Sequence, residues 1–360
     1  SVVSFLLADF KGGTAFDALV SLPHVTGVIT DLDGQTAVRA ISSLRAEVRY
    51  RESVLASAGA RDVGDARVEL PRLIVVVDEY AALMGDHLEL AHVFADVAAR
   101  GRALGIHLIL GTQRATGIIR DAVLGNAPLR IALRVTDAAD SRLVIGTDQA
   151  ARLPGSVDAR GRALLRRAAD VEPVSMQIVR TPPQSIAAVA QMRAGEQLPR
   201  QPWLPPLPAR LTLDEIRASS KTSEGDENIG RSGVLLGMLD EPDQQRRRSW
   251  RFAPARDRSL LVLGAGGSGR STLLRVAAAQ APGALWLPSD PEHGWDVLED
   301  LARGRKQCTL LLIDDVDTLL AGLGDEYAIL ALSRVEAILR AGRAGVIATG
   351  RRLAGPLARI

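Results

Sequence analysis

Hydrophobic residues in the first half of the chain gather in short runs that are separated by amphipathic stretches. Five of these runs are expected to be strands: Val2–Ala8, Leu73–Val77, Ile106–Leu110, Ile131–Val135 and Val174–Val179. Between them, Thr36–Leu55 and Leu88–Leu104 place apolar residues at helical spacing. Because strands and helices alternate, and because the apolar runs are continuous, the pattern predicts an α/β fold with a doubly wound parallel sheet and helices on both faces.

The pattern loosens after Val179 and starts again near Gly233. Prolines crowd into 198–213 and polar residues into 219–233, which is typical of a semi-rigid linker. The second pattern predicts, in order, strand Ser259–Leu263, helix Ser271–Gln280, strands Ala284–Leu287 and Thr309–Ile313, helix Glu326–Ala341 and strand Gly345–Ala348. We therefore expect a first domain at 1–197, a linker at 198–232 and a second domain at 233–360.

Two pairs of segments match between the halves. "LIVVVDEYAALM" (73–84) and "LLLIDDVDTLL" (310–320) both pass from an apolar strand through two acids into an apolar helix start. Further along, "GRALGIHLILGTQR" (101–114) matches "GRAGVIATGR" (342–351), which makes Thr112 and Thr349 counterparts. Matches at nearly equal separation predict one domain type used twice.

A glycine-rich segment, "GAGGSGRST" (264–272), lies between a predicted strand and a predicted helix. Backbone N–H groups of such a loop, together with the positive end of the helix dipole, bind phosphate. The spacing fits a phosphate-binding loop for ATP and Mg²⁺, with arginine in the lysine position. Ser271 and, through water, Asp314 are the predicted Mg²⁺ ligands. The predicted nucleotide-binding residues are Gly264, Gly266, Gly267, Ser268, Gly269, Arg270, Ser271, Thr272, Asp314 and Asp315.

A dinucleotide site is the alternative interpretation of this loop. Gly264, Gly266 and Gly269 also fit G-x-G-x-x-G, and Asp290 follows Gly269 by 21 residues, where a dinucleotide fold keeps its ribose-binding acid. The Ser-Thr pair after the loop and the acids of "LLLIDD" (310–315) favour phosphoryl transfer instead.

Four residues of the first half are predicted to be catalytic. Asp78 ends a buried strand and can hold the hydration shell of Mg²⁺, whereas Glu79 can orient and deprotonate the attacking water. Gln113 ends the next strand, where it can help to position that water. Arg142 is a candidate arginine finger toward a neighbouring subunit. The competing interpretation of the acid pair is a strand that simply ends in solvated charges.

Composition narrows the possible functions. The net charge is only +2, from 44 basic and 42 acidic residues, which does not indicate a polycation shaped for nucleic acid. The arginines and aromatics of "QQRRRSWRF" (244–252) could bind nucleic acid by charge and stacking, but an edge segment with a solvated face is favoured. One cysteine, Cys308, excludes an internal disulfide framework. No apolar run has the length needed to cross a bilayer.

Several motifs resemble the FtsK/SpoIIIE family of RecA-like motor ATPases. They are "DFKGG" (9–13), "LPHV" (22–25), "VVDEY" (76–80), "GRALGIHLILGTQR" (101–114) and "DSR" (140–142). The second half, with "WLPPLP" (203–208) and "GMLDEPDQQ" (237–245), resembles the tandem ATPase domains of EccC/EssC-type type VII secretion motors. The resemblance implies two tandem RecA-like P-loop domains with parallel sheets. The family's phosphate loop precedes "DFKGG", so the first domain is expected to lack its N-terminal part.

The resemblance also implies a function. ATP turnover in a ring, a hexamer in this family, would drive export of small helical proteins. The motor would be cytoplasmic and tethered to the inner face of the cell membrane by segments outside this chain. A double-stranded DNA translocase and a non-hydrolysing nucleotide-binding scaffold are the alternatives.

Two departures from the family pattern concern the second domain. Arg270 replaces a lysine and Asp315 replaces a glutamate, which implies a second domain that regulates rather than hydrolyses. We expect weak or no ATP hydrolysis by these 360 residues alone.

Overall fold

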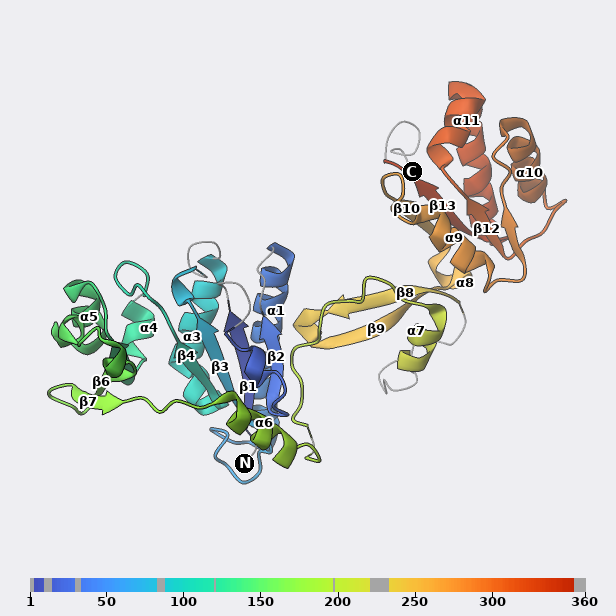
Figure 1. The fold of residues 1–360 in the computed structure, drawn as a ribbon. Coiled ribbons are helices and arrows are strands. Elements are labelled where there is room, and N and C mark those ends of the chain that lie inside the picture. Colours follow the sequence, from blue (N-terminus) through green and yellow to red (C-terminus); the bar gives the residue numbers. More distant parts are fainter. Residues whose placement is uncertain are drawn as a thin grey trace. The chain divides into compact units, whose positions relative to one another are not determined.

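The chain divides into two compact units in a computed structural model (Figure 1). The structure describes residues 3–9, 15–29, 34–82, 88–119, 121–196, 198–220 and 233–352. The first unit runs to Pro206 and includes the segment Glu241–Arg246, and the second comprises Leu207–Asp240 and the chain from Arg247 onward.

A four-stranded parallel sheet forms the centre of the first unit. Its strands are β1 (Val3–Asp9), β2 (Val25–Ile29), β3 (Arg72–Asp78) and β4 (Ile106–Leu110). They lie in the order β2-β1-β3-β4, and the register sets Asp9 beside Asp78 at the carboxyl end of the sheet. The helices α1 (Gly34–Ala58) and α3 (Leu88–Leu104) flank this sheet (Figure 1).

Only one face of β3 is deeply buried. Leu73, Val75 and Val77 pack with residues of α1 and α3 in one apolar cluster, whereas the alternate residues Ile74 and Val76 are half-buried. The sequence predicted helices over both faces of the sheet. In the part of the first unit that the structure describes, α1 and α3 both contribute to the cluster on a single face.

The first unit also contains a separate antiparallel sheet. It comprises β5 (Leu129–Leu133), β6 (Arg162–Arg167) and β7 (Val174–Gln177), in that order. The prediction that the runs at 131–135 and 174–179 join a parallel sheet is therefore wrong. The link from β6 to β7 is too short for a parallel crossover, so the strands pair antiparallel. Helices α4 (Asp121–Gly125) and α5 (Ala138–Ile145) lie in this part of the chain, whereas α6 (Pro183–Met192) follows β7 and lies near the parallel sheet of the unit (Figure 1).

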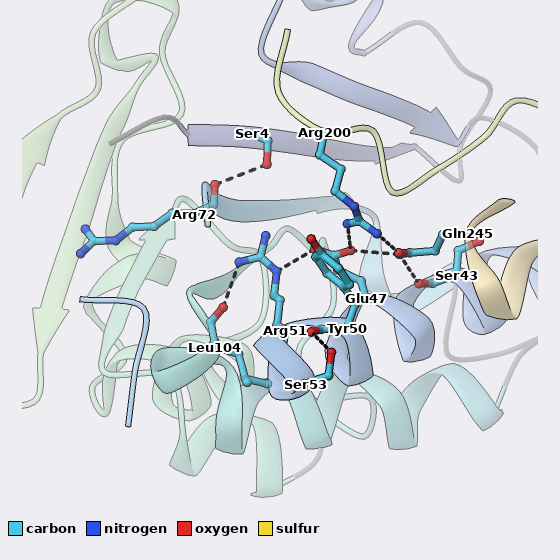
Figure 2. Close-up of polar contacts among 10 residues, drawn as sticks. All are labelled: Ser4, Ser43, Glu47, Tyr50, Arg51, Ser53, Arg72, Leu104, Arg200 and Gln245. Atoms are coloured by element: carbon cyan, nitrogen blue, oxygen red, sulfur yellow. Dashed lines mark hydrogen bonds and ion pairs between the residues drawn. The ribbon is translucent and has the colours of Figure 1, made fainter. Parts of the chain in front are cut away.

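A buried ion-pair network fastens α1 to two later segments of the same unit. Figure 2 shows the Glu47 carboxylate between Arg51, 2.7 Å away, and Arg200, 2.6 Å away, with the Gln245 amide 2.9 Å from it. Glu47 and Arg51 are almost fully buried. Because both carboxylate oxygens have charged partners, the desolvation of Glu47 is compensated.

A second parallel sheet lies in the second unit, in the order β10-β13-β12-β11. Its elements are β10 (Ser259–Leu263), α9 (Arg270–Ala278), β11 (Ala284–Trp286), α10 (Pro291–Arg303), β12 (Leu310–Ile313), α11 (Val316–Arg340) and β13 (Gly345–Gly350). Ahead of it come α7 (Leu213–Ser220), the paired strands β8 (Val234–Glu241) and β9 (Arg246–Phe252), and α8 (Pro254–Asp257).

Both faces of β12 (Leu310–Ile313) are covered, which fits its continuous apolar run. Leu311 and Ile313 pack in a cluster with α10 and α11, whereas Leu310 and Leu312 pack in a second cluster with α9, Val234 and Phe252. The helix α11 begins ten residues before the predicted start at Glu326, and it is interrupted at Gly324, whose φ is 74°. The sequence pattern detected only the part after that glycine.

Candidate functional site

The glycine-rich loop of the second unit connects β10 to α9. The backbone of Gly264 donates from its N–H to the Gly350 carbonyl at 3.1 Å, which ties the loop to the end of β13. Gly269 precedes α9 with a φ of 94°. A residue with a Cβ atom would be strained in this conformation, whereas glycine is not. A Cβ at Gly266, Gly267 or Gly269 would meet nothing within 4 Å, so there is free space over the loop. Amides at the start of α9 can therefore bind phosphate.

Thr349 links the two acids that follow β12. Its buried hydroxyl donates to Asp314 Oδ1 at 2.6 Å and accepts from the Asp315 N–H at 2.9 Å. Burial raises the pKa of Asp314, but hydrogen bonds from Thr349 and Ser271 outweigh it and hold the pKa below its ordinary value. The structure thus brings together Ser271 and an ionised Asp314, the two predicted Mg²⁺ ligands. A hydroxyl and a carboxylate are the oxygen ligands that Mg²⁺ prefers.

Arg270 does not extend freely over the loop. Its guanidinium lies 3.4 Å from Asp315 Oδ1, and Arg351 lies 3.7 Å from the other oxygen of that carboxylate. Thr318 donates to the same carboxylate at 3.0 Å. The Asp315 carboxylate is therefore shared by Arg270, Arg351 and Thr318 in this arrangement.

Asp78 and Glu79 follow β3 in the first unit. Glu79 is buried and has φ of 54°, and its N–H donates to Asp78 Oδ1 at 3.1 Å. Its Oε1 lies 3.3 Å from the backbone N–H of Gln113 and from the hydroxyl of Thr112. That hydroxyl has one proton and is closer to the Arg114 carbonyl, at 2.8 Å, so the Gln113 amide is the steadier donor.

The strand register changes one pairing that the sequence suggested. Val77 lies opposite Leu110, and Ile313 opposite Ala348, so Thr349 corresponds to Gly111 rather than to Thr112. Thr112 is one residue further along. Both threonine hydroxyls contact an acid after the central strand, but they do so from different positions.

Two other predicted residues lie elsewhere. Arg142 is exposed on α5, outside the strand ends that carry Asp78 and Glu79. Asp290 caps α10, where its carboxylate accepts from the His293 N–H at 3.0 Å. This capping role accounts for Asp290 without the ribose contact that the dinucleotide alternative required.

The contacts that Glu47 and Asp140 make with distant segments were not predicted from the sequence. Glu47 looks like an ordinary charge on an amphipathic helix, and its partners Arg200 and Gln245 are far along the chain. Asp140 accepts from the backbone N–H groups of Ala115 and Thr116 at 3.1 and 2.8 Å. The "DSR" motif was the available signal, although it drew attention to the arginine.

The described residues contain neither a cluster of metal-ligating side chains nor a membrane-spanning helix. Within the described ranges, no group of three or more His, Cys, Asp or Glu residues could hold a metal ion. None of the helices there combines the length and apolarity that a membrane span requires.

Parallel sheets, a glycine-rich loop before α9 and acids after the central strands define the class: RecA-like P-loop ATPase domains. Residues 1–164 match the FtsK/SpoIIIE family, and the resemblance to that family and to the EccC/EssC motors is confirmed. The type VII secretion system protein EssC of Staphylococcus aureus NCTC 8325 is 25% identical over 331 residues, or 76% of this chain and 22% of EssC. The chain thus spans about a fifth of the length of the curated relatives it matches.

Solved structures show the same fold over nearly the whole chain. The cytoplasmic domain of the Thermomonospora curvata type VII secretion ATPase EccC has a TM-score of 0.79 and 23% identity, over 98% of this chain and 50% of that one. Thermomonospora curvata EccC (ATPases 2 and 3) in complex with a signal sequence peptide has a TM-score of 0.63 and 19% identity, over 99% and 73%.

Proposed function

We propose that this chain is an ATP-binding motor module that energises protein export in a type VII-like secretion system. In this proposal the first unit hydrolyses ATP within the intact protein, and the second is a regulatory unit. The observation that carries it is the arrangement after β3, where Asp78 and the buried Glu79 end the strand and Glu79 Oε1 accepts from the Gln113 N–H. In the second unit the corresponding Asp315 is ion-paired with Arg270.

The chemistry assigned to the first unit follows from its side chains. Bound Mg²⁺–ATP would supply the transferable phosphoryl group and the metal charge. Asp78 would hold water of the metal's hydration shell, and Glu79 would take the proton of the attacking water on its carboxylate. Gln113 would position that water. Arg142, exposed on α5, would reach the phosphates of a neighbouring copy in a ring.

The second unit is proposed to bind nucleotide without turning it over. Loop amides at 264–269 would bind the phosphates, with Ser271 and Asp314 toward Mg²⁺. Arg270 is a bulkier and flatter cation than lysine, and it must leave Asp315 before it can contact a phosphate. Occupancy of this site would therefore change the charges at the carboxyl end of its sheet.

Relatives support the export role. The chain is similar to EssC and EccC, and an EccC structure is described as a complex with a signal sequence peptide. By that similarity we propose secreted helical proteins as substrates, self-association into a ring, and a cytoplasmic site tethered to the membrane by segments outside this chain. Transport of double-stranded DNA, or binding without hydrolysis, is the competing outcome of the experiments.

A nucleotide titration tests the second site. A fluorescent ATP analogue with Mg²⁺ is added to the wild type, to Arg270→Ala and to Arg275→Ala, which removes an exposed arginine further along the same helix. We expect saturable binding in the wild type and in the Arg275 variant, and loss of it in the Arg270 variant. Absence of binding in all three proteins would contradict regulation by nucleotide at this site.

A further inference from the structure

Asp140 is a buried carboxylate to which the proposed hydrolysis assigns no role. One oxygen, Oδ1, accepts three hydrogen bonds: from the N–H groups of Ala115 and Thr116 at 3.1 and 2.8 Å, and from the Thr116 hydroxyl at 2.7 Å. The carboxylate is on α5 and all three donors belong to the loop after β4. Asp140 therefore joins two segments that are 25 residues apart.

The loop that Asp140 holds also contacts Glu79. Gln113 donates its backbone N–H to Glu79 Oε1 at 3.3 Å, and only Arg114 separates Gln113 from the pair of donors that Asp140 receives. Residues 112–116 are thus fixed at one end by the proposed catalytic base and at the other by Asp140. With so few residues between the two attachments, a shift at one end moves the other.

Neighbouring residues fasten the helix that carries Asp140. Asp137 caps α5 by accepting from the Ala139 N–H at 2.7 Å. The buried Ser141 hydroxyl donates to the Thr147 carbonyl at 2.6 Å and accepts from the Ala150 N–H at 3.1 Å. Asp140 is therefore attached to a rigid element, and the next residue after Ser141 is the exposed Arg142.

The charge of Asp140 suits this role. The hydrogen bonds from Thr116, first its hydroxyl and then its amide, hold the pKa of Asp140 below the ordinary value of an aspartate. An ionised carboxylate accepts only, and hydrogen bonds to a charged acceptor are stronger than those to a neutral one. An asparagine of the same size would bind this loop less firmly.

We propose that Asp140 is a positioning residue for ATP hydrolysis: it holds the 112–116 loop against α5 and so fixes Gln113 beside Glu79. The inference rests on the proposed hydrolytic role of the first unit. The same helix presents Arg142 to the outside, so the geometry around the catalytic base is tied to the element that would face a neighbouring copy.

The test compares Asp140→Asn with Asp137→Asn in the intact protein. Both changes remove one carboxylate charge from the start of α5, but only Asp140 reaches the loop. We measure kcat and KM for ATP hydrolysis, and hydrogen exchange of the Ala115 and Thr116 amides. For Asp140→Asn we expect kcat to fall about tenfold or more with KM within about twofold, because small misplacements of catalytic groups are costly. Both amides should also exchange faster, and Asp137→Asn should change neither measurement.

Other outcomes overturn the inference. If Asp140→Asn speeds exchange but leaves kcat unchanged, Asp140 holds the loop without positioning Glu79. If both variants lower kcat alike, general weakening of α5 is the cause. Should Asp140→Asn fail to fold, Thr116→Val removes a single donor, and an unchanged kcat there would count against the proposal.

A wild type without hydrolysis would instead overturn the proposed function, and the inference would fall with it. An active wild type with an equally active Asp140→Asn variant overturns the inference alone.

Discussion

Each unit places two acids directly after a central strand, and the units differ in what the second acid contacts. Glu79 and Asp315 both adopt positive φ, 54° and 49°, directly after the central strand. In the second unit Thr349 lies within β13 and binds both acids, and Arg270 and Arg351 surround Asp315. In the first unit glycine occupies the equivalent register position, and Glu79 accepts from the loop beyond it.

The two units therefore share a backbone arrangement but differ in the side-chain contacts of the second acid. In both units the second acid itself has the left-handed backbone conformation directly after a buried strand. This shared conformation does not depend on the chemical role of the acid. In the second unit the carboxylate of that acid is engaged by Arg270 and Arg351. This arrangement supports the proposal that turnover belongs to the first unit.

The largest effect should come from removing the proposed base. We expect Glu79→Gln to lower ATP turnover of the intact protein by about 10² to 10⁴-fold, the usual contribution of a general base. Asp315→Asn is the matched change in the second unit and should leave turnover within about threefold, because the proposal assigns hydrolysis to the first unit and Asp315 is engaged by Arg270. Steady-state phosphate release measures both variants. Equal losses in the two variants would remove the distinction between the units.

A second contrast concerns carboxylates that lie between two arginines. Glu47 in the first unit is almost fully buried, whereas Glu299 in the second is 13% exposed and pairs with the more exposed Arg303 and Arg334. Glu47→Gln leaves the buried Arg51 without a counter-charge and should cost about 3 kcal/mol of unfolding free energy. Glu299→Gln should cost about 1 kcal/mol or less. Urea denaturation measures both, and a Glu299 cost equal to that of Glu47 would contradict the role of burial.

Sequence periodicity predicted the parallel sheets because their signal is local. The strands Ile106–Leu110 and Ser259–Leu263 and the helix Leu88–Leu104 were placed to the residue, since continuous apolar runs and helical spacing mark them directly. The short strand β2 was missed because Gly27 interrupts its apolar pattern. The helix α10 was missed as well, although Asp290 and Pro291 form a cap and first-turn signal.

Pairing partners were harder to predict than elements. Nothing in the run at 131–135 distinguishes a parallel from an antiparallel strand, since that depends on β6 and on the short connection to β7. The glycine loop and acid pairs were visible because their residues are adjacent in sequence. The ion pair between Arg270 and Asp315 was not visible, because it joins side chains 45 residues apart through the fold.

Breaking the ion pair between Arg270 and Asp315 should have a smaller effect, on nucleotide affinity. Asp315→Asn should free Arg270 for phosphate and tighten binding of a fluorescent ATP analogue by about threefold to tenfold, since a partly exposed pair is worth about 1 kcal/mol. Thr318→Val removes another partner of the same carboxylate without changing charge, and should leave the affinity unchanged. Weaker binding in Asp315→Asn would show that the acid helps to hold the nucleotide.

The smallest effect is the loss of stability at acid pH, which one lowered carboxylate pKa in each unit predicts. Burial opposes ionisation of Glu47, but Arg51 and Arg200 outweigh it and lower its pKa below the ordinary 4.5. A carboxylate whose pKa is lower in the folded state adds stability that is fully present above its unfolded pKa and is lost as pH falls through the folded value. The first unit should therefore lose stability below about pH 4.5, and Glu47→Gln should flatten that loss.

Asp314→Asn provides the matched test in the second unit, because hydrogen bonds from Thr349 and Ser271 lower the pKa of Asp314 despite its burial. Unfolding midpoints between pH 6 and pH 4 measure each effect. Equal acid slopes in wild type and Glu47→Gln would mean that other carboxylates carry the acid sensitivity of the first unit. The network around Glu47 would then stabilise that unit by geometry rather than by charge.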